Sequence, residues 1–164
     1  MNKTLVGLVL ALAAFAGWYF LVPSEESRVR ETFKSMSAAI DKNGTEPNLE
    51  ALGKARRAVA LVEPGCTLEA FGKTFTLSKV GADITQQVVA FRVMASHIHV
   101  SFEDVSVAFT DKATAEVTCD FFYTGDDFGW SVRDARALDA TLRKDPASGR
   151  WRFARVRVSN IIEK

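Results

Sequence analysis

The sequence has few of the residues from which metal and redox sites are built. Its 164 residues include two cysteines and two histidines. Cys66 and Cys119 lack the CxxC spacing of redox and zinc motifs, and no further ligands follow His97 and His99 at a recognisable spacing. We therefore expect neither a metal site nor a cofactor.

The sequence also has no excess of charge of either sign. Lys and Arg number 21 against 20 Asp and Glu, a formal net charge of +1. This balance excludes a globally basic protein that coats nucleic acid or anionic membrane by bulk attraction. Internal repeats, low-complexity tracts and long linkers are missing as well. We expect one globular domain with no nucleic-acid partner.

One segment lacks charge altogether, and it lies near the amino terminus. The nineteen residues from Thr4 to Val22 are uncharged, which is close to the roughly 20 residues that a membrane-spanning helix needs. Lys3 before this run predicts that the rest of the chain lies outside the cytoplasm. We expect residues 1–23 to be a single-pass anchor in a bacterial inner membrane, contacting it through residues 4–22, and residues 24–164 to be a periplasmic domain.

A cleaved signal peptide is the alternative interpretation of this segment. Ala14 and Ala16 are small residues at the two positions that a signal peptidase recognises. The domain would then be secreted. The apolar run continues for six residues past Ala16, which favours an uncleaved anchor.

Both interpretations export the domain, so Cys66 and Cys119 lie in a compartment that permits disulfides. Cys119 alternates in step with Ala115, Val117 and Phe121, which predicts that it points into the core. Sequence spacing does not decide whether the two sulfurs meet. A disulfide and two separate buried thiols are both open.

The apolar periodicity changes from helical to alternating near residue 97. Helices are predicted over residues 24–44, 48–62 and 82–96, two short strands between residues 66 and 78, and long strands over residues 99–110, 113–124, 132–144 and 150–161. Turn signals join the long strands as antiparallel hairpins. This order predicts an α+β domain in which three helices pack on one face of a curved antiparallel sheet.

The end of the chain, "ALDATLRKDPASGRWRFARVRVSNI", combines a strand, a glycine-containing turn and a last strand that opens with Trp151 and carries Ser159. Together with the order of helices and strands, it resembles the nuclear transport factor 2-like superfamily, also called the cystatin-like cone or SnoaL-like fold, over residues 24–164. The resemblance implies this fold. It says little about function, because the scaffold hosts isomerases, dehydratases, assembly domains and ligand-binding proteins.

Enzymes of that superfamily, such as the ketosteroid isomerase and scytalone dehydratase types, use acidic or histidine side chains that project into the cone. Asp139 is the best catalytic candidate, since it alternates in step with small residues that could line a cavity. Asp120 is expected on a solvated face. His97 and His99 are expected to be ordinary helix-end and strand residues. The sequence favours a non-enzymatic role.

The last predicted strand, "RWRFARVRVSN", interleaves arginines with aromatic and apolar residues. If Arg155 and Arg157 face the cone with Trp151 and Phe153, they form a binding site for a carboxylate or phosphate. If they face outward, they are rim residues of an interface, or ion pairs with the acidic hairpin of residues 97–127 account for them. Many enzymatic and ligand-binding relatives have His-x-His where this chain has Arg155-Val156-Arg157, which weakens any transfer of active-site residues.

The loop "TGDDFGWS" places Phe128 and Trp130 beside two Asp and two Gly. These aromatics either fold back over the sheet or form an interface with a partner. We expect an interaction or assembly domain with a protein partner or a second copy as its ligand. A short anchor before this fold resembles the periplasmic domain of type IV secretion assembly factors and the Mce-associated membrane proteins. A domain that binds a small apolar or anionic ligand in the cone is the alternative, and an isomerase- or dehydratase-like enzyme is the third interpretation.

Overall fold

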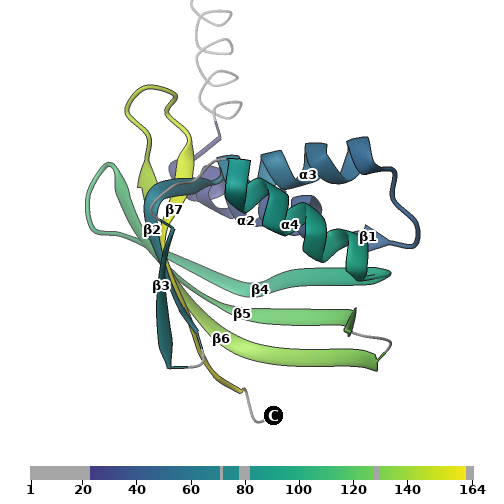
Figure 1. Cartoon of the computed structure of the whole chain (residues 1–164). Helices are drawn as coiled ribbons and strands as arrows, with labels where there is room; N and C mark the ends of the chain where they lie inside the picture. Colours follow the sequence, from purple (N-terminus) through teal and green to yellow (C-terminus); the bar gives the residue numbers. More distant parts are fainter. Residues whose placement is uncertain (1–22, 71, 78–81, 128–129, 162–164) are drawn as a thin grey trace, which may run out of the picture.

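The computed structural model describes residues 23–70, 72–77, 82–127 and 130–161. Within them the chain forms three helices and seven strands (Figure 1). The helices are α2 (Glu25–Ile40), α3 (Asn48–Ala60) and α4 (Ala82–Met94). The strands are β1 (Lys42–Asn43), β2 (Val62–Ala70), β3 (Lys73–Leu77), β4 (His97–Phe109), β5 (Thr114–Asp127), β6 (Trp130–Lys144) and β7 (Trp151–Ile161).

The strands form one curved sheet in the order β1-β4-β5-β6-β7-β2-β3, and the helices cover its concave side (Figure 1). The predicted α+β architecture is confirmed. The prediction of an antiparallel sheet is wrong in one place, because β2 runs parallel to β7. The sequence holds no local signal for this pair, since a turn motif reports only on strands that it joins directly.

Helix α2 begins where the sequence predicts. The Oγ of Ser24 accepts a hydrogen bond from the N–H of Ser27 at 3.1 Å, and two acidic residues occupy the first turn. Val29 and Phe33, one turn apart, are buried against the sheet. Local capping and apolar spacing therefore agree in this helix.

Helix α3 also forms where predicted, but it buries a different face. The small side chains of Ala51, Ala55 and Ala58 are buried. Leu49, which the periodicity places on the apolar face, is 81% exposed. The alanine side chain ends at Cβ, so this face lets α3 pack closely against α2 and α4.

Strand β2 starts earlier than predicted. The sequence predicts the first short strand after residue 66, whereas the strand begins at Val62 and runs through Glu63, Pro64 and Gly65. Its pairing with β7 shifts register between Val62 and Thr67, and Gly65 has a φ of +86°. Pro64 and Gly65 therefore mark an irregularity within the strand, where both residue types are tolerated.

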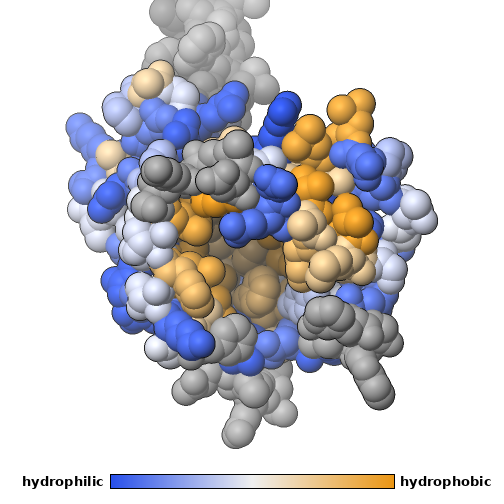
Figure 2. Space-filling view, viewed as in Figure 1, coloured by the Kyte–Doolittle hydropathy of each residue, from blue (hydrophilic) through white to orange (hydrophobic). Residues whose placement is uncertain are grey.

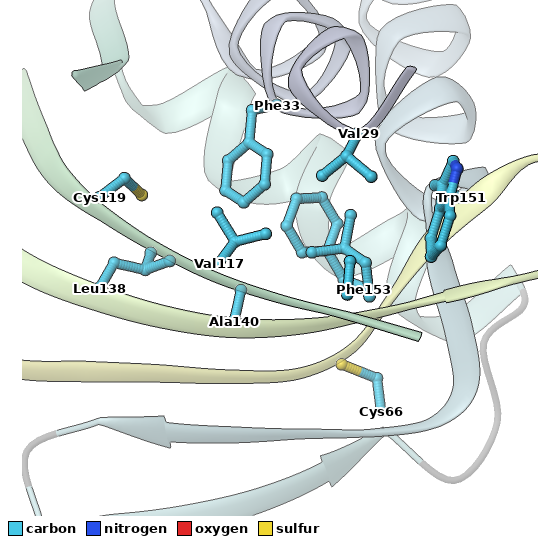
Figure 3. Close-up of a cluster of buried hydrophobic side chains, with 11 residues drawn as sticks. Val29, Phe33, Cys66, Val117, Cys119, Leu138, Ala140, Trp151 and Phe153 are labelled. Atoms are coloured by element: carbon cyan, nitrogen blue, oxygen red, sulfur yellow. The ribbon is translucent and has the colours of Figure 1, made fainter. Parts of the chain in front are cut away.

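The main core lies between α2 and the centre of the sheet (Figure 3). Val29 and Phe33 point from α2 towards Val117, Ala140 and Phe153 on three adjacent strands. The rings of Phe33 and Phe153 meet edge to face, with centroids 4.9 Å apart. Aromatic and branched side chains thus fill the part of the cone beneath α2.

Two predicted segments lie wholly or partly outside the described residues, the anchor and the loop between β5 and β6. None of the described helices is long and apolar enough to cross a membrane, and the predicted anchor, residues 4–22, lies outside the described residues. The predicted loop between β5 and β6 is short, because the strands extend to Asp127 and from Trp130.

Candidate functional site

A bulge in β7 separates the four residues that the sequence grouped as a ligand site. Phe153 pairs with Leu142 and Arg155 pairs with Thr141, so Ala154 is an extra residue in the ladder. Trp151 and Phe153 are buried in the core, whereas Arg155 and Arg157 are exposed on the opposite face of the sheet. The structure therefore does not bring the arginines and the aromatics into one pocket.

The two exposed arginines share one carboxylate. Arg155 donates to Glu69 Oε1 at 2.7 Å, and Arg157 donates to Glu69 Oε2 at 2.7 Å. These hydrogen bonds lower the pKa of Glu69. The partner comes from β2, the parallel neighbour of β7, instead of from the acidic hairpin that the sequence indicated.

Asp139 also lies on the outer face. It is exposed and sits opposite Arg157 in the ladder, in an open groove of about 280 Å³ that Glu116 and Thr141 also line. A hydrogen bond of 3.0 Å joins Thr141 to Glu116. The Asp139 carboxylate is therefore solvated and does not project into the cone.

The two histidines do not form a site with other metal-binding side chains of the described residues. The Nδ1 of His99 lies 3.4 Å from Asp41 at the surface, and His97 pairs with Asn43 of β1. The described residues contain no group of three or more metal-binding side chains. Phe128 and the side chain of Trp130 lie outside what the structure describes.

Both cysteines are free and buried. They belong to the main core cluster but come from different strands, β2 and β5, and Figure 3 shows them well separated. Burial raises the pKa of Cys66 to about 11 and that of Cys119 to about 12. The structure thus contains two separate buried thiols, the second of the two interpretations left open by the sequence.

Helix α4 is inverted relative to an ordinary surface helix. The sequence predicts an inward apolar face that includes Phe91, with Arg92 elsewhere on the circumference. In the structure Arg92 is 1% exposed, while Phe91, Val93 and Met94 are 46%, 61% and 67% exposed. The last turn of this helix therefore buries a charge and exposes three large apolar side chains.

The buried Arg92 side chain uses all of its hydrogen-bond donors. It donates to the carboxylate of Glu46 at 2.9 and 2.8 Å. It also donates to the backbone carbonyls of Ala39, Ile40 and Asp41 at 3.1, 2.5 and 3.0 Å. Arg92 thus satisfies the carbonyl groups that helix α2 leaves unpaired at its carboxyl end, and its hydrogen bonds lower the pKa of Glu46 to about 2.

Lys42 makes the reverse connection. Its Nζ donates to the carbonyls of Arg92 and Ala95 at 2.5 and 2.6 Å, which lie at the carboxyl end of α4. Each helix is therefore capped by a cation from the other segment, where positive charge is favoured. The sequence offered one signal for this network, a lone arginine within the apolar run "VVAFRVMA".

Four exposed apolar residues gather on this side of the molecule. We call them the α4 patch: Leu49, Phe91, Val93 and Met94. Asn48, next to Leu49, lines the same groove as Val93 and Met94, so the start of α3 adjoins the end of α4. Figure 2 shows the apolar surface over α4 and the start of α3.

A polar pair lies on the concave face of the sheet. Asp134 and Arg136 sit opposite Tyr123 and Phe121, whose rings pack in the core clusters. The Nε of Arg136 donates to Asp134 at 2.6 Å, and the two side chains are 18% and 28% exposed. This pair is not among the predicted site residues, although Arg136 alternates in step with the buried Leu138 and thus shares its face.

The concave side is also hollowed. Figure 2 shows a depression with apolar walls between α4 on one side and β2 and β3 on the other. Asp134 is an acidic residue on this concave face of the sheet, whereas Asp139 lies on the outer face. Its carboxylate is already engaged by Arg136.

Comparisons with known proteins identify the fold but not the site or the activity. No protein-family model matches the chain, and no curated protein matches it. The chain is similar to an NTF2-like protein with a cystatin-like fold from Novosphingobium aromaticivorans, with 15% identity, a TM-score of 0.59 and coverage of 96% of this chain and 88% of the other. It is also similar to LinA, with 12% identity, a TM-score of 0.62 and coverage of 82% and 84%.

A third similar structure is a ketosteroid isomerase-like protein from Shewanella frigidimarina, with 16% identity, a TM-score of 0.55 and coverage of 79% of this chain and 92% of the other. The domain thus has the nuclear transport factor 2-like, cystatin-like fold that the sequence indicated. At such identities the similarity extends to architecture and does not assign a site.

Proposed function

We propose that the chain is a membrane-anchored, extracytoplasmic interaction or assembly domain that binds a protein partner through the α4 patch. The inversion of α4 carries this proposal. A helix that buries an arginine and exposes Phe91, Val93 and Met94 contradicts the usual arrangement of a surface helix, in which the apolar stripe faces the core.

The surroundings of the patch fit a protein partner. Interfaces combine an apolar centre that is poor in charge with a polar rim. Gln86, Gln87 and Ser96 are exposed near the patch and carry no charge. A partner with a complementary apolar surface would remove this patch from water at little electrostatic cost.

The proposed anchor comes from the uncharged run of residues 4–22. Pro23 and the capping residue Ser24 follow it directly, so the domain would start within two residues of the membrane. The topology is tested by fusing alkaline phosphatase after Lys164. The enzyme should be active and sediment with membranes, whereas a soluble, shortened chain would indicate secretion after cleavage, and an inactive fusion would contradict export.

Site-specific photo-cross-linking tests the partner surface in cells that express the full chain. A photoreactive residue at Met94 should yield one discrete adduct, which the added substitution Val93→Glu should abolish. The same residue at Phe109 serves as the control, because Phe109 is 44% exposed but lies on β4. Equal adducts at both positions, or adducts insensitive to Val93→Glu, would contradict the proposal.

A second candidate function is binding of a small ligand in the concave hollow. The Asp134–Arg136 pair favours it, since a few placed polar groups in an apolar cavity are typical of ligand sites. The apolar anion 8-anilinonaphthalene-1-sulfonate is a suitable probe. Its fluorescence with the native chain should fall after Arg136→Gln and stay unchanged after Arg155→Gln on the outer face. The third interpretation, an isomerase- or dehydratase-like enzyme, is supported by the fold alone, which the ketosteroid isomerase-like protein shares.

A further inference from the structure

The two edges of the sheet are treated differently by the fold. At the β4 edge, β1 pairs with the first two residues of β4. Beyond it, the N–H of Val100 donates to Asp41 Oδ1 at 2.9 Å, and the hydroxyl of Ser37 donates to the carbonyl of Val100. Farther along, the register shifts beside Asp104, which has a φ of +50°. Short cover strands, side-chain caps and bulges all prevent pairing with another chain.

The described part of the chain supplies none of these features at the opposite edge, β3. Within the described residues only β2 pairs with β3. Residues 73–76 are exposed, and Phe75 is 50% exposed. Lys73 is the sole charged residue of the strand, and no proline interrupts it. Such an edge offers unpaired N–H and C=O groups to another strand.

The faces of β3 show what an added strand must present. Phe75 and Leu77 sit opposite Leu68 and the buried Cys66, so they lie on the concave side. Thr74 and Thr76 lie on the outer side with the alternating period of a strand. A partner strand therefore needs apolar and polar residues in the same alternation.

We infer that β3 pairs with β3 of a second copy of this chain, antiparallel and centred on Phe75. In this register Thr74 faces Thr76 of the partner and Lys73 faces Leu77, so like charges never meet. Threonine pairs and aromatic pairs across strands are favourable. The segment is thus complementary to itself under two-fold symmetry, as an isologous contact requires, and two sheets join into one.

A five-residue contact is small beside the roughly 1,200–2,000 Å² that stable interfaces bury. The pair therefore exchanges rapidly, and a covalent trap is the appropriate detector. Residues opposite each other in an antiparallel pair have Cα atoms about 4.5–5.5 Å apart, which lies within the range that a disulfide spans.

The test is oxidative cross-linking of the full-length chain with Phe75→Cys, read on a non-reducing gel. The matched control is Phe109→Cys on β4, far from β3 in the strand order. It is the same substitution at a similarly exposed position, 44% against 50%. The native cysteines are buried in both variants. We expect at least a tenfold excess of covalent dimer from Phe75→Cys.

A second variant adds Thr76→Pro to Phe75→Cys. Ala70 and Lys73 close a two-residue hairpin between β2 and β3. The alternation of an antiparallel ladder then turns the N–H and C=O of Thr76 away from β2 and towards the open edge. Proline at this position removes only the N–H donor that the second copy needs. The dimer should vanish while cooperative thermal unfolding persists. A dimer that survives Thr76→Pro, equal yields from both cysteine variants, or a cross-link to a different protein would overturn the inference. The α4 patch experiment is unaffected by any of these outcomes, because β3 lies across the hollow from α4 (Figures 1 and 2).

Discussion

At the scale of single residues, the most consequential side chain is Arg92. Its five donors end on one carboxylate and three backbone carbonyls. Burying a charge is costly unless every donor finds a partner. Here the partners come from α2 and from the segment before α3, so one side chain joins three parts of the chain.

Removing that side chain should destabilise the fold strongly. Arg92→Met leaves the Glu46 carboxylate and the carbonyls of α2 without their donors, which costs about 3–5 kcal/mol of unfolding free energy for a broken buried pair. Arg92→Lys should recover only part of the loss, because lysine lacks the planar fork. Urea unfolding measures both. Arg30→Met, which removes an exposed pair with Glu26, is the control and should cost under about 1 kcal/mol.

Glu46 makes the same network sensitive to acid. Its pKa is about 2 in the folded chain against an ordinary 4.5, so the ionised form stabilises the fold fully above pH 4.5. This contribution is lost as the pH falls from 4.5 towards 2. Glu46→Gln should be less stable at pH 7 and should lose less additional stability over that acid range. Parallel stability–pH curves for the two proteins would contradict this assignment.

At the scale of elements, bulges decide which residues share a face. The alternation in "RWRFARVRVSN" predicts that Trp151, Phe153, Arg155 and Arg157 point the same way. The extra residue Ala154 shifts the alternation by one position, so Arg155 and Arg157 point to the face opposite Phe153. A similar irregularity interrupts β2 near Gly65. Periodicity is a local rule, and an inserted residue invalidates it downstream.

Deletions in β7 test this account. Deleting Ala154 restores plain alternation and leaves Trp151 and Phe153 inside and the arginines outside, so cooperative unfolding should persist with a moderate loss of stability. Deleting Arg152 makes Trp151 and Phe153 neighbours, which forces one of these rings out of the core. Circular dichroism melts should separate the two deletions. If both abolish cooperative unfolding, Ala154 is not the surplus residue.

The helices and strands themselves were largely predictable from the sequence, because caps, turns and apolar spacing are local. Ser24 marked the start of α2, and the change of period near residue 97 marked the start of the sheet. The faces of α3 and α4 were not predictable. Their buried residues are alanines and an arginine, and hydrophobicity assigns both to the wrong side.

At the scale of the whole molecule, the candidate site was harder to predict than the fold. Asp139 and the arginines of β7 drew attention because they are distinctive in the sequence, yet the fold places them on the outer face. Alternation with the buried Leu138 puts Asp134 and Arg136 on the inner face, but their charge indicates a solvated one. Pairing with Tyr123 and Phe121 of β5 decides between these two signals, and that pairing depends on contacts between strands.

The buried cysteines report on the global state of the molecule. Cys66 and Cys119 are 3% and 6% exposed, and burial raises the pKa of each thiol. At pH 8 both should react with Ellman's reagent at least a hundredfold more slowly in the native chain than in urea. If the chain unfolded in urea without a reductant shows no thiol that reacts with Ellman's reagent, it contains a disulfide instead.

The exchanged caps of α2 and α4 have a consequence for biogenesis. The chain is synthesised from its amino terminus, so the carboxyl end of α2 emerges about fifty residues before Arg92. Until then α2 lacks its cap, whereas Lys42, the cap of α4, has already emerged when α4 is made. A nascent chain that stops after α3 should therefore remain sensitive to protease, and one that includes α4 and the strands should become resistant in a single step.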